Sequence, residues 1–465
     1  MPKIKNVSSG GKKLRRNKLA GNGNAKFKFN SFFAGIGGFD LGFERAGIAP
    51  AFHCEINEFC NSVLRRHWPN LPSSEDIKTL SADQLPDADV WCGGFPCQDV
   101  SVARGWLGRD GLKGKNTGLF YPFLKLVKEK LPQVVLLENV TGLLNSHKGH
   151  DFRTIISSFT DLGYGVAWRV MNARYFGAPQ SRPRVFICAW KGRVDLALHA
   201  LYEKDCVSVG NAREGFVTPT TCQFSGVTVP LVGYCLAATS GRHTGTDWSR
   251  TYVSYFDKVR RLTPTECEGL QGFPTGWSLP EKEYPVCDDD IDTLRYHSIG
   301  NAVCVPVVEW IAARIVSGFS GGFERFHIGA SLNLKAQENI NGMFMDFKNA
   351  LLGQFRDLHF IDQEKPSTIC WASGGAAFAE WYLSGKVSPA PTDPIESQLI
   401  DIIEKREVDG KYFLSPNAAT GILRRVDKQG RTLFGPLDAA LRRLAVKNDD
   451  SESCSLDCSS KVANA

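Results

Sequence analysis

The stretch FKFNSFFAGIGGFDLGFERAG, residues 27–47, decides the fold. It begins with an apolar run typical of a buried strand, passes through Gly35, Gly37 and Gly38, and continues with apolar residues at helical spacing. Glycines between a strand and a helix let the backbone approach a ligand at the helix N-terminus, although tight turns without a ligand show the same pattern. The stretch therefore predicts the first strand, turn and helix of an α/β fold.

The ligand at this turn is predicted to carry an adenosine but no diphosphate. A dinucleotide fingerprint would place glycine at position 40, where the chain has Asp40. Glu55 follows Gly35 by 20 residues and ends the second predicted strand, where a carboxylate can bind the two hydroxyls of a ribose.

Short apolar runs alternate with helical stretches from Phe27 to Trp190, which predicts a largely parallel sheet covered on both faces. Ligands of such sheets bind beyond the carboxyl ends of the strands, so side chains that follow the strands are the candidates for chemistry. The predicted strands are residues 27–33, 49–56, 88–92, 133–140 and 184–190.

The rest of the chain divides less clearly. Residues 191–257 are rich in Gly, Thr and Val, which indicates a small β-rich domain. A loop is expected up to about Arg295, then a glycine turn and an amphipathic helix, and residues 319–400 look rich in loops. The predicted parts are a basic arm (1–27), a catalytic and cofactor-binding domain (28–190), a target-recognition domain with hinge (191–298), a returning helix (299–318) and a C-terminal extension (319–465).

Two helix starts are predicted in this second half of the chain. Thr263 with Glu266 three residues later is a capping pattern, and Ser415 directly before Pro416 is typical of the first turn of a helix.

Composition excludes several classes of protein. The net charge of +6 comes from the N-terminal arm, which suits phosphate contacts but equally a solvated tail. No apolar run reaches the length of a membrane span, and no secretory signal is evident. The 14 cysteines are dispersed without a zinc-like pattern, so a metal site is not expected.

Cys97 differs from the other cysteines because it follows the stretch GGFP at the end of a predicted strand. Most cysteines are simply packed, and a nucleophilic one needs a suitable environment. The next loop, residues 98–118, is basic and has five glycines, which suits a lid over a polyanion and equally an ordinary surface loop.

Three charged residues are expected near Cys97. Glu138 ends the strand at 133–140, on the same edge of the sheet, where a carboxyl can bind a ring nitrogen or cap a helix. Arg182 and Arg184 alternate at the entry to the next predicted strand and so point the same way, an arrangement that suits anion or carbonyl recognition.

Six segments, in this order and spacing, resemble the DNA cytosine-5 methyltransferases, and the resemblance runs from about residue 28 to 317. It implies the Rossmann-like fold of S-adenosylmethionine-dependent methyltransferases with a small β-rich target-recognition domain. The segments are FFAGIGG, GGFPCQDVS, LLENV, QSRPRVF, RRLTPTECEGLQGFP and SIGNAV.

The resemblance also implies S-adenosylmethionine as cofactor and duplex DNA as substrate. Cys97 would be the nucleophile that adds to C6 of a flipped cytosine, Glu138 would hold N3 and the amino group, and Arg182 and Arg184 the carbonyl side and nearby backbone. The cofactor would be bound at the glycine turn with Gly35 and Gly37, by Phe33 at the adenine, Glu55 at the ribose, Asp76 and Ile77 around the base, and Asn301 and Val303 near the methionine.

Two positions depart from the family pattern. Ser31 stands where the family usually has aspartate, and Asp99 introduces a carboxylate two residues after Cys97, which would raise the pKa of the thiol. Two alternatives therefore remain: methylation of RNA, and a DNA-binding protein that has lost catalysis. A monomer is expected, because one catalytic unit encloses one flipped base. The tail YFLSPNAATGILRR resembles C-terminal extensions of phage and prophage members, which suggests protection of DNA from restriction in the cytoplasm of a bacterial or phage-infected cell.

Overall fold

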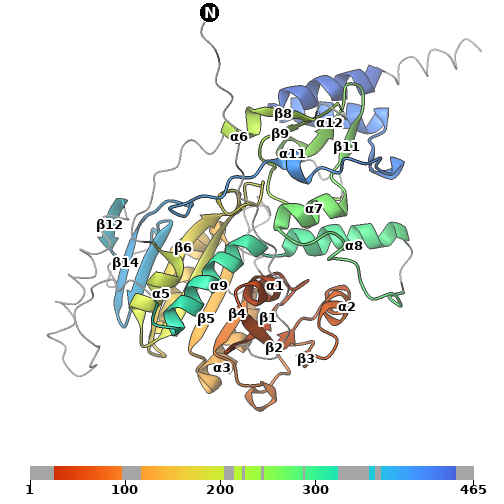
Figure 1. Ribbon diagram of the computed structural model, residues 1–465. Helices are drawn as coiled ribbons and strands as arrows, with labels where there is room; N and C mark the ends of the chain where they lie inside the picture. Colours follow the sequence, from red (N-terminus) through yellow and green to blue (C-terminus); the bar gives the residue numbers. More distant parts are fainter. Residues whose placement is uncertain are drawn as a thin grey trace, which may run out of the picture.

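A ten-stranded sheet and a four-stranded sheet organise the molecule (Figure 1). The computed structural model describes residues 26–96, 117–203, 214–222, 226–241, 246–285, 288–322, 356–361 and 368–446. The large sheet has the order β12-β14-β13-β6-β7-β5-β4-β1-β2-β3, and the small one the order β11-β10-β9-β8. Helices α7 (Pro264–Gln271) and α8 (Asp288–Asn301) lie between the two sheets (Figure 1).

The parallel half of the large sheet sets the position of the site. β1 pairs in parallel with β2 on one side and with β4 on the other, and β4 pairs in parallel with β5. The strand order thus reverses between β1 and β4, and ligands of such sheets bind in the crevice at this reversal. The strands are β1 (Phe27–Phe32), β2 (Ile48–Cys54), β3 (Ser73–Ser74), β4 (Val90–Gly93) and β5 (Val134–Val140).

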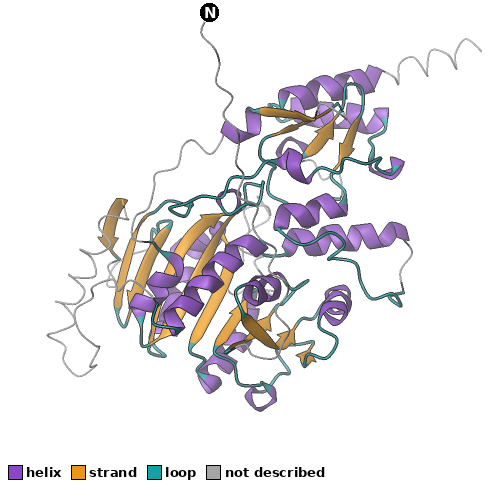
Figure 2. Cartoon of the chain, in the orientation of Figure 1, coloured by secondary structure: helices purple, strands orange, loops and turns teal. Residues whose placement is uncertain are grey.

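Helices cover both faces of this sheet, as the sequence predicted (Figure 2). The prediction of a largely parallel sheet was wrong, because the strands from β5 to β12 in the sheet order pair antiparallel. Because side chains alternate along a strand, Val134 and Leu136 enter one apolar cluster, and Val135 and Leu137 the other. The first cluster contains residues of α1 (Gly38–Arg45), α5 (Val194–Leu201) and α9 (Val305–Phe319), and the second contains residues of α3 (Phe120–Lys130) and α4 (His150–Thr160).

The strand β6 (Tyr164–Asn172) was missed in the sequence. It pairs antiparallel with β7 (Pro183–Lys191), which in turn runs antiparallel to β5. Arg169 interrupts the apolar pattern of β6, yet its side chain is fully buried and donates to the carbonyls of Leu201, Ser388 and Ala390. A buried arginine is rare, so its position inside a strand could not be expected from sequence.

The C-terminal segment extends the large sheet, which corrects the expectation of a loop-rich region. β13 (Gly374–Phe378) pairs antiparallel with β6, and β14 (Trp381–Lys386) lies between β13 and β12 (Arg356–Phe360). A Cβ atom on Gly375 would lie 2.1 Å from Cζ2 of Trp168, so only glycine fits at this close approach.

The small sheet is antiparallel and has an apolar cluster on each side. One cluster joins Val227 and Val253 to residues of α7 and α8, and the other joins Tyr252 and Val259 to α12 (Pro416–Lys428). Both predicted caps are confirmed, because Thr263 forms a capping box with Glu266 and Ser415 caps α12. The strands are β8 (Pro219–Cys222), β9 (Val227–Pro230), β10 (Tyr252–Ser254) and β11 (Val259–Arg261).

Two boundaries differ from the sequence prediction. α5, which was placed in the target-recognition domain, packs in the cluster of the large sheet. The expected loop before Arg295 is irregular over residues 273–285, but its end belongs to the helix α8, which begins at Asp288. Gly300 lies inside this helix, where a Cβ would approach the carbonyl carbon of Ala237 to 2.4 Å. The glycine thus permits close packing and does not make a turn.

Residues 435–446 are also helical. Further elements complete the fold. They are α2 (Glu58–His67), α6 (Glu214–Val217), α11 (Leu399–Ile402), and the 3₁₀ helices η1 (Ala82–Gln84), η4 (Thr117–Leu119), η5 (Thr141–Gly149), η6 (Ala173–Tyr175), η7 (Asp247–Ser249) and η8 (Gly410–Tyr412).

The packing of β14 predicts that the C-terminal strands share the stability of the catalytic core. Leu383 is fully buried in the cluster that also contains α5 and α9. We expect Leu383→Ala to lower the free energy of unfolding by about 2–5 kcal/mol, because it leaves a cavity. Denaturant unfolding measures this, with the exposed Glu396→Ala as control. An unchanged unfolding curve for Leu383→Ala would show that these strands are not part of the cooperative core.

Candidate active site

The glycine turn after β1 has a left-handed backbone at Phe33, Gly35 and Gly37, with φ angles of 53°, 55° and 81°. A left-handed phenylalanine is uncommon and strained, and such residues gather at functional sites. The backbone N–H of Gly35 donates to Oε2 of Glu55 at 2.8 Å, so the turn and the end of β2 are joined directly.

Glu55 is half-buried beside this turn. Its Oε1 atom accepts a hydrogen bond of 2.8 Å from the N–H of Asn57. Burial raises the pKa of the Glu55 carboxyl, while the backbone donors Asn57, Gly35 and Ile56 oppose the shift. A carboxylate held by backbone donors at this crevice fits the ribose hydroxyls of an adenosine.

Asp76 and Ile77 lie near the end of β2, because Cys54 pairs with Ser74. Oδ1 of Asp76 accepts a hydrogen bond of 2.9 Å from the N–H of Lys78, which fixes the turn. Ile77 is buried in the apolar cluster with Phe32, so its side chain forms part of the wall behind this region.

The junction between α8 and α9 lies against the glycine turn. A Cβ atom on Gly38 would lie 2.8 Å from Cγ1 of Val303 and 2.9 Å from its carbonyl oxygen. Asn301 is exposed at the end of α8. The glycine turn and the α8–α9 junction, the two segments that the resemblance assigned to the cofactor, are therefore adjacent in space although they are far apart in sequence.

Ser31, which departs from the family pattern, is linked to a buried carboxylate. Its Oγ donates to Oδ2 of Asp40 at 3.0 Å, and Oδ1 of Asp40 lies 2.8 Å from Nε2 of His53. All three side chains are buried. Ser31 is thus part of a buried polar cluster with a carboxyl from the first turn of α1, nine residues later.

Glu138 lies at the carboxyl end of β5, and Arg184 holds its Oε1 at 3.0 Å from Nε. A Cβ atom on Gly94 would lie 3.2 Å from Oε2 of Glu138, so the chain after β4 passes close to this carboxyl. Nδ2 of Asn139 donates to the carbonyl of Phe95 at 3.2 Å and fixes the same segment. Cys97 and the loop 98–116 lie outside the described residues, as does Asp99.

Arg182 and Arg184 point to the same place, because each has an Nη atom near Sγ of Cys235. They differ in their other partners. Arg182 is only 3% exposed, and its guanidinium donates to the backbone carbonyls of Leu236, Gly300 and Ala302 at 2.8, 3.1 and 2.8 Å. Arg184 alone contacts Glu138. The predicted pair therefore separates into one residue at the carboxyl and one that binds the protein's own backbone.

Sequence reasoning missed the polar contacts that join the two sheets. Nε2 of Gln180 donates to Leu270 and to Gln271, and Nε2 of Gln271 donates to the carbonyls of Ile299 and Ala302. Both glutamines are fully buried. They lie inside the quoted segments QSRPRVF and LQGFP, but the segments do not reveal that the two are partners.

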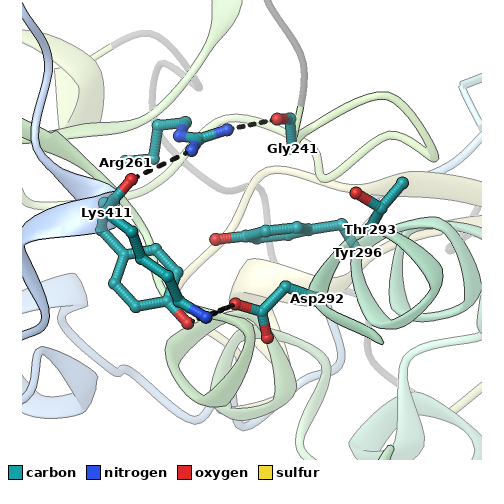
Figure 3. A pocket seen from close by; sticks show the side chains of 7 residues that line it. Gly241, Arg261, Asp292, Thr293, Tyr296 and Lys411 are labelled. Atoms are coloured by element: carbon teal, nitrogen blue, oxygen red, sulfur yellow. Dashed lines mark hydrogen bonds and ion pairs between the residues drawn. The ribbon is translucent and has the colours of Figure 1, made fainter. Parts of the chain in front are cut away.

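A pocket that does not include the predicted site residues lies where β11, α8 and the C-terminal segment meet (Figure 3). Asp292 accepts from Lys411 at 2.7 Å and from the hydroxyl of Tyr412 at 2.6 Å, while Arg261 donates to the carbonyls of Gly241 and Lys411. Its charged groups are thus engaged with each other and with backbone.

Within the described ranges, no group of three His, Cys, Asp or Glu side chains could hold a metal ion. No single helix of these ranges is long and apolar enough to cross a membrane, and only the bent pair Ile291–Asn301 with Val305–Phe319 passes that test by length and composition.

The contact between Gly38 and Val303 predicts a sensitive position. We expect Gly38→Ala to push the α8–α9 junction away from the glycine turn and to weaken the binding of S-adenosylmethionine about tenfold or more. Isothermal titration calorimetry measures the affinity. Gly435→Ala is the control, because a Cβ there meets no atom within 4 Å. Equal affinity of both variants would contradict a cofactor site between these two segments.

The comparisons with known proteins agree with this arrangement. The family described as C-5 cytosine-specific DNA methylase matches residues 27–214 and 224–317, which is more than half of the chain. The chain is 31% identical over 319 residues to the Type II methyltransferase M1.ScrFI of Lactococcus lactis subsp. cremoris, covering 63% of this chain and 78% of that protein.

Two further relatives show the same extent of similarity. The Type II methyltransferase M.DsaV of Dactylococcopsis salina is 31% identical over 316 residues, covering 63% of this chain and 86% of the relative. M.Bsp6I of Bacillus sp. (strain RFL6) is 30% identical over 317 residues, covering 61% and 97%. The chain therefore belongs to the C-5 cytosine-specific DNA methylases, enzymes that transfer a methyl group from S-adenosylmethionine to C5 of cytosine in DNA.

Proposed function

We propose that the enzyme methylates a flipped cytosine in a short duplex sequence through a covalent bond between Cys97 and C6 of the base. The thiolate of Cys97 adds to C6, and the electron pair moves to C5, which becomes nucleophilic. S-adenosylmethionine supplies an electrophilic methyl group to that carbon. The C5 proton then leaves to a base, and the thiolate is expelled, which restores the aromatic ring.

The geometry at Glu138 is the observation that carries this proposal. Its carboxyl lies beside the chain that leads from β4 to Cys97, and Asn139 holds that chain through the carbonyl of Phe95. Cytosine presents N3 and an amino group side by side, so one carboxyl can contact both. Arg184 holds Oε1 of this carboxyl and so fixes its orientation. A cytosine bound to the carboxyl would then lie at the edge of the sheet where the chain leads from β4 to Cys97, with C6 and C5 near that segment.

The cofactor is proposed to bind in the crevice over β1 and β4. Phe33 would contact the adenine, Glu55 the ribose, Asp76 and the wall at Ile77 the rim of the base, and Asn301 and Val303 the methionine part. The support is the joining of the glycine turn to Glu55 and its contact with the α8–α9 junction. Arg182 supports that junction through the carbonyls of Gly300 and Ala302.

Target recognition is proposed for the small sheet and its loops. The sheet lies across the molecule from the parallel strands, with α7 and α8 between (Figure 1). Such loops can read base edges in the groove. We further propose that the protein acts as a monomer in the cytoplasm of a bacterial or phage-infected cell, where methylation protects DNA from restriction.

The covalent step predicts a trapped adduct. Fluorine at C5 cannot leave as a cation, so a duplex with 5-fluorocytosine should stay joined to the wild-type enzyme in the presence of S-adenosylmethionine. Cys97→Ala should form no adduct and lose methyl transfer by about 10³-fold or more. Denaturing mass analysis detects the adduct, with the exposed Cys370→Ala as matched control.

Three other outcomes are informative. Duplex binding without an adduct would identify a DNA-binding protein without this catalysis. An adduct with RNA alone would move the substrate class to RNA. An adduct that persists in Cys97→Ala would assign the nucleophile to another cysteine.

The environment of Glu55 predicts a pH dependence of cofactor binding. Ribose hydroxyls donate to the ionised carboxylate, and burial raises the pKa of this carboxyl in the free protein above 4.5. Affinity should therefore be constant above the raised pKa and fall by up to about tenfold per pH unit below it. Calorimetry over this range measures it. Glu55→Gln should bind weakly at every pH, and an equal slope in this variant would assign the titration to another group.

A further inference from the structure

Cys235 lies in the segment after β9, at residues 231–241, and its sulfur is placed between two guanidinium groups. Nη1 of Arg182 is 3.5 Å from Sγ, and Nη2 of Arg184 is 3.8 Å from it. The residue is partly buried. The resemblance assigned no role to this position.

The sulfur connects the two halves of the site. On one side, Arg184 binds Oε1 of Glu138 at 3.0 Å. On the other side, Arg182 binds the carbonyls of Gly300 and Ala302, which flank Asn301 at the α8–α9 junction. A continuous line of contacts therefore runs from the carboxyl proposed for the base to the segment proposed for the cofactor.

The charges along this line balance only if the sulfur is ionised. Two guanidinium groups carry two positive charges, and Glu138 supplies one negative charge. Arg182 is almost completely buried, where an uncompensated charge is costly. A thiolate at Cys235 would bring the sum of the four groups to zero.

The environment of the thiol agrees with an ionised sulfur. Burial raises the pKa of the Cys235 thiol, but the charges and hydrogen bonds of Arg184 and Arg182 outweigh burial and lower this pKa below 9.0. Cys304 lies at the start of α9, and burial raises the pKa of its thiol to about 12, so it adds no charge here.

We propose that Cys235 is a positioning residue for methyl transfer, whose thiolate holds Arg184 at Glu138 and Arg182 at the α8–α9 junction. The proposal rests on the role proposed for Glu138. The competing arrangement is a neutral thiol that donates to the carbonyl of Leu236, at 3.5 Å. That carbonyl also accepts a bond of 2.8 Å from Arg182. A neutral thiol would leave the two guanidinium groups beside the sulfur without the negative charge that they face.

Two substitutions separate charge from shape. Cys235→Ser keeps a small polar group but removes the negative charge, and we expect kcat to fall about tenfold with little change in KM for DNA. Cys235→Asp restores a negative charge and should recover part of that loss. Cys370→Ser, at an exposed cysteine outside the small sheet, is the control and should behave like wild type.

The ionisation itself is measured without activity. Thiolates absorb in the near ultraviolet where thiols do not, so the difference in absorbance between Cys97→Ser and Cys97→Ser/Cys235→Ser reports the sulfur of Cys235 as pH is raised. We expect a midpoint below 9.0, the ordinary value for a thiol. A midpoint at or above that value would overturn the proposal even if Cys235→Ser were slow, because the sulfur would then act as a neutral group.

The activity measurements test the positioning role independently of the absorbance. If Cys235→Ser kept the kcat and the pH profile of wild type, the positioning role would be wrong while the covalent mechanism could still hold. If Cys97→Ala abolished the adduct and Cys235→Ser alone slowed methyl transfer with partial rescue by aspartate, both proposals would be supported. An enzyme that forms no adduct at all contradicts the mechanism and leaves the absorbance midpoint as the test of Cys235.

Discussion

The buried guanidinium of Arg182 is the contact on which the relation of the two sheets depends. It enters from the start of β7, which belongs to the catalytic sheet, and binds one carbonyl in the segment after β9 and two at the α8–α9 junction. Loss of a hydrogen-bonded partner from such a buried charge is costly, so the three segments are held to one geometry. The start of β7, the segment after β9 and the α8–α9 junction are therefore held together by the same side chain.

This constraint matters because the residues of the proposed site come from segments that are far apart in the sequence. The glycine turn and Glu55 come from the first two strands, Glu138 from β5, and Asn301 and Val303 from the return of the chain after the small domain. The reversal of strand order at β1 opens the crevice, but it does not bring the α8–α9 junction to it. That approach depends on Gly38, where any side chain would meet Val303.

The C-terminal segment serves both sheets. Its strands continue the large sheet beyond β6, and α12 covers the small sheet on the side opposite α7 and α8. Between them the chain makes backbone hydrogen bonds with Tyr175, Leu231 and Val259 in turn. The C-terminal residues beyond the family match, which ends at residue 317, thus contact both the large and the small sheet. The extension therefore helps to hold the two sheets in place.

The sequence by itself determined the α/β class, the glycine turn, the carboxylate at the end of β2 and the order of the family segments, because these depend on local periodicity and on spacing along the chain. It also predicted the helix caps at Thr263 and Ser415, which are satisfied within a few residues. Only the tertiary structure decided which charged groups are buried. Arg169 interrupts the apolar pattern by which β6 could have been predicted, and the carbonyls that make its burial possible lie in distant segments. Asp40 reaches Ser31 and His53 only after α1 folds back on β1. Arg182 and Arg184 look equivalent in sequence, yet one binds backbone carbonyls and the other a carboxyl. The partner of each guanidinium depends on the groups that surround it in the folded chain, and these come from distant segments.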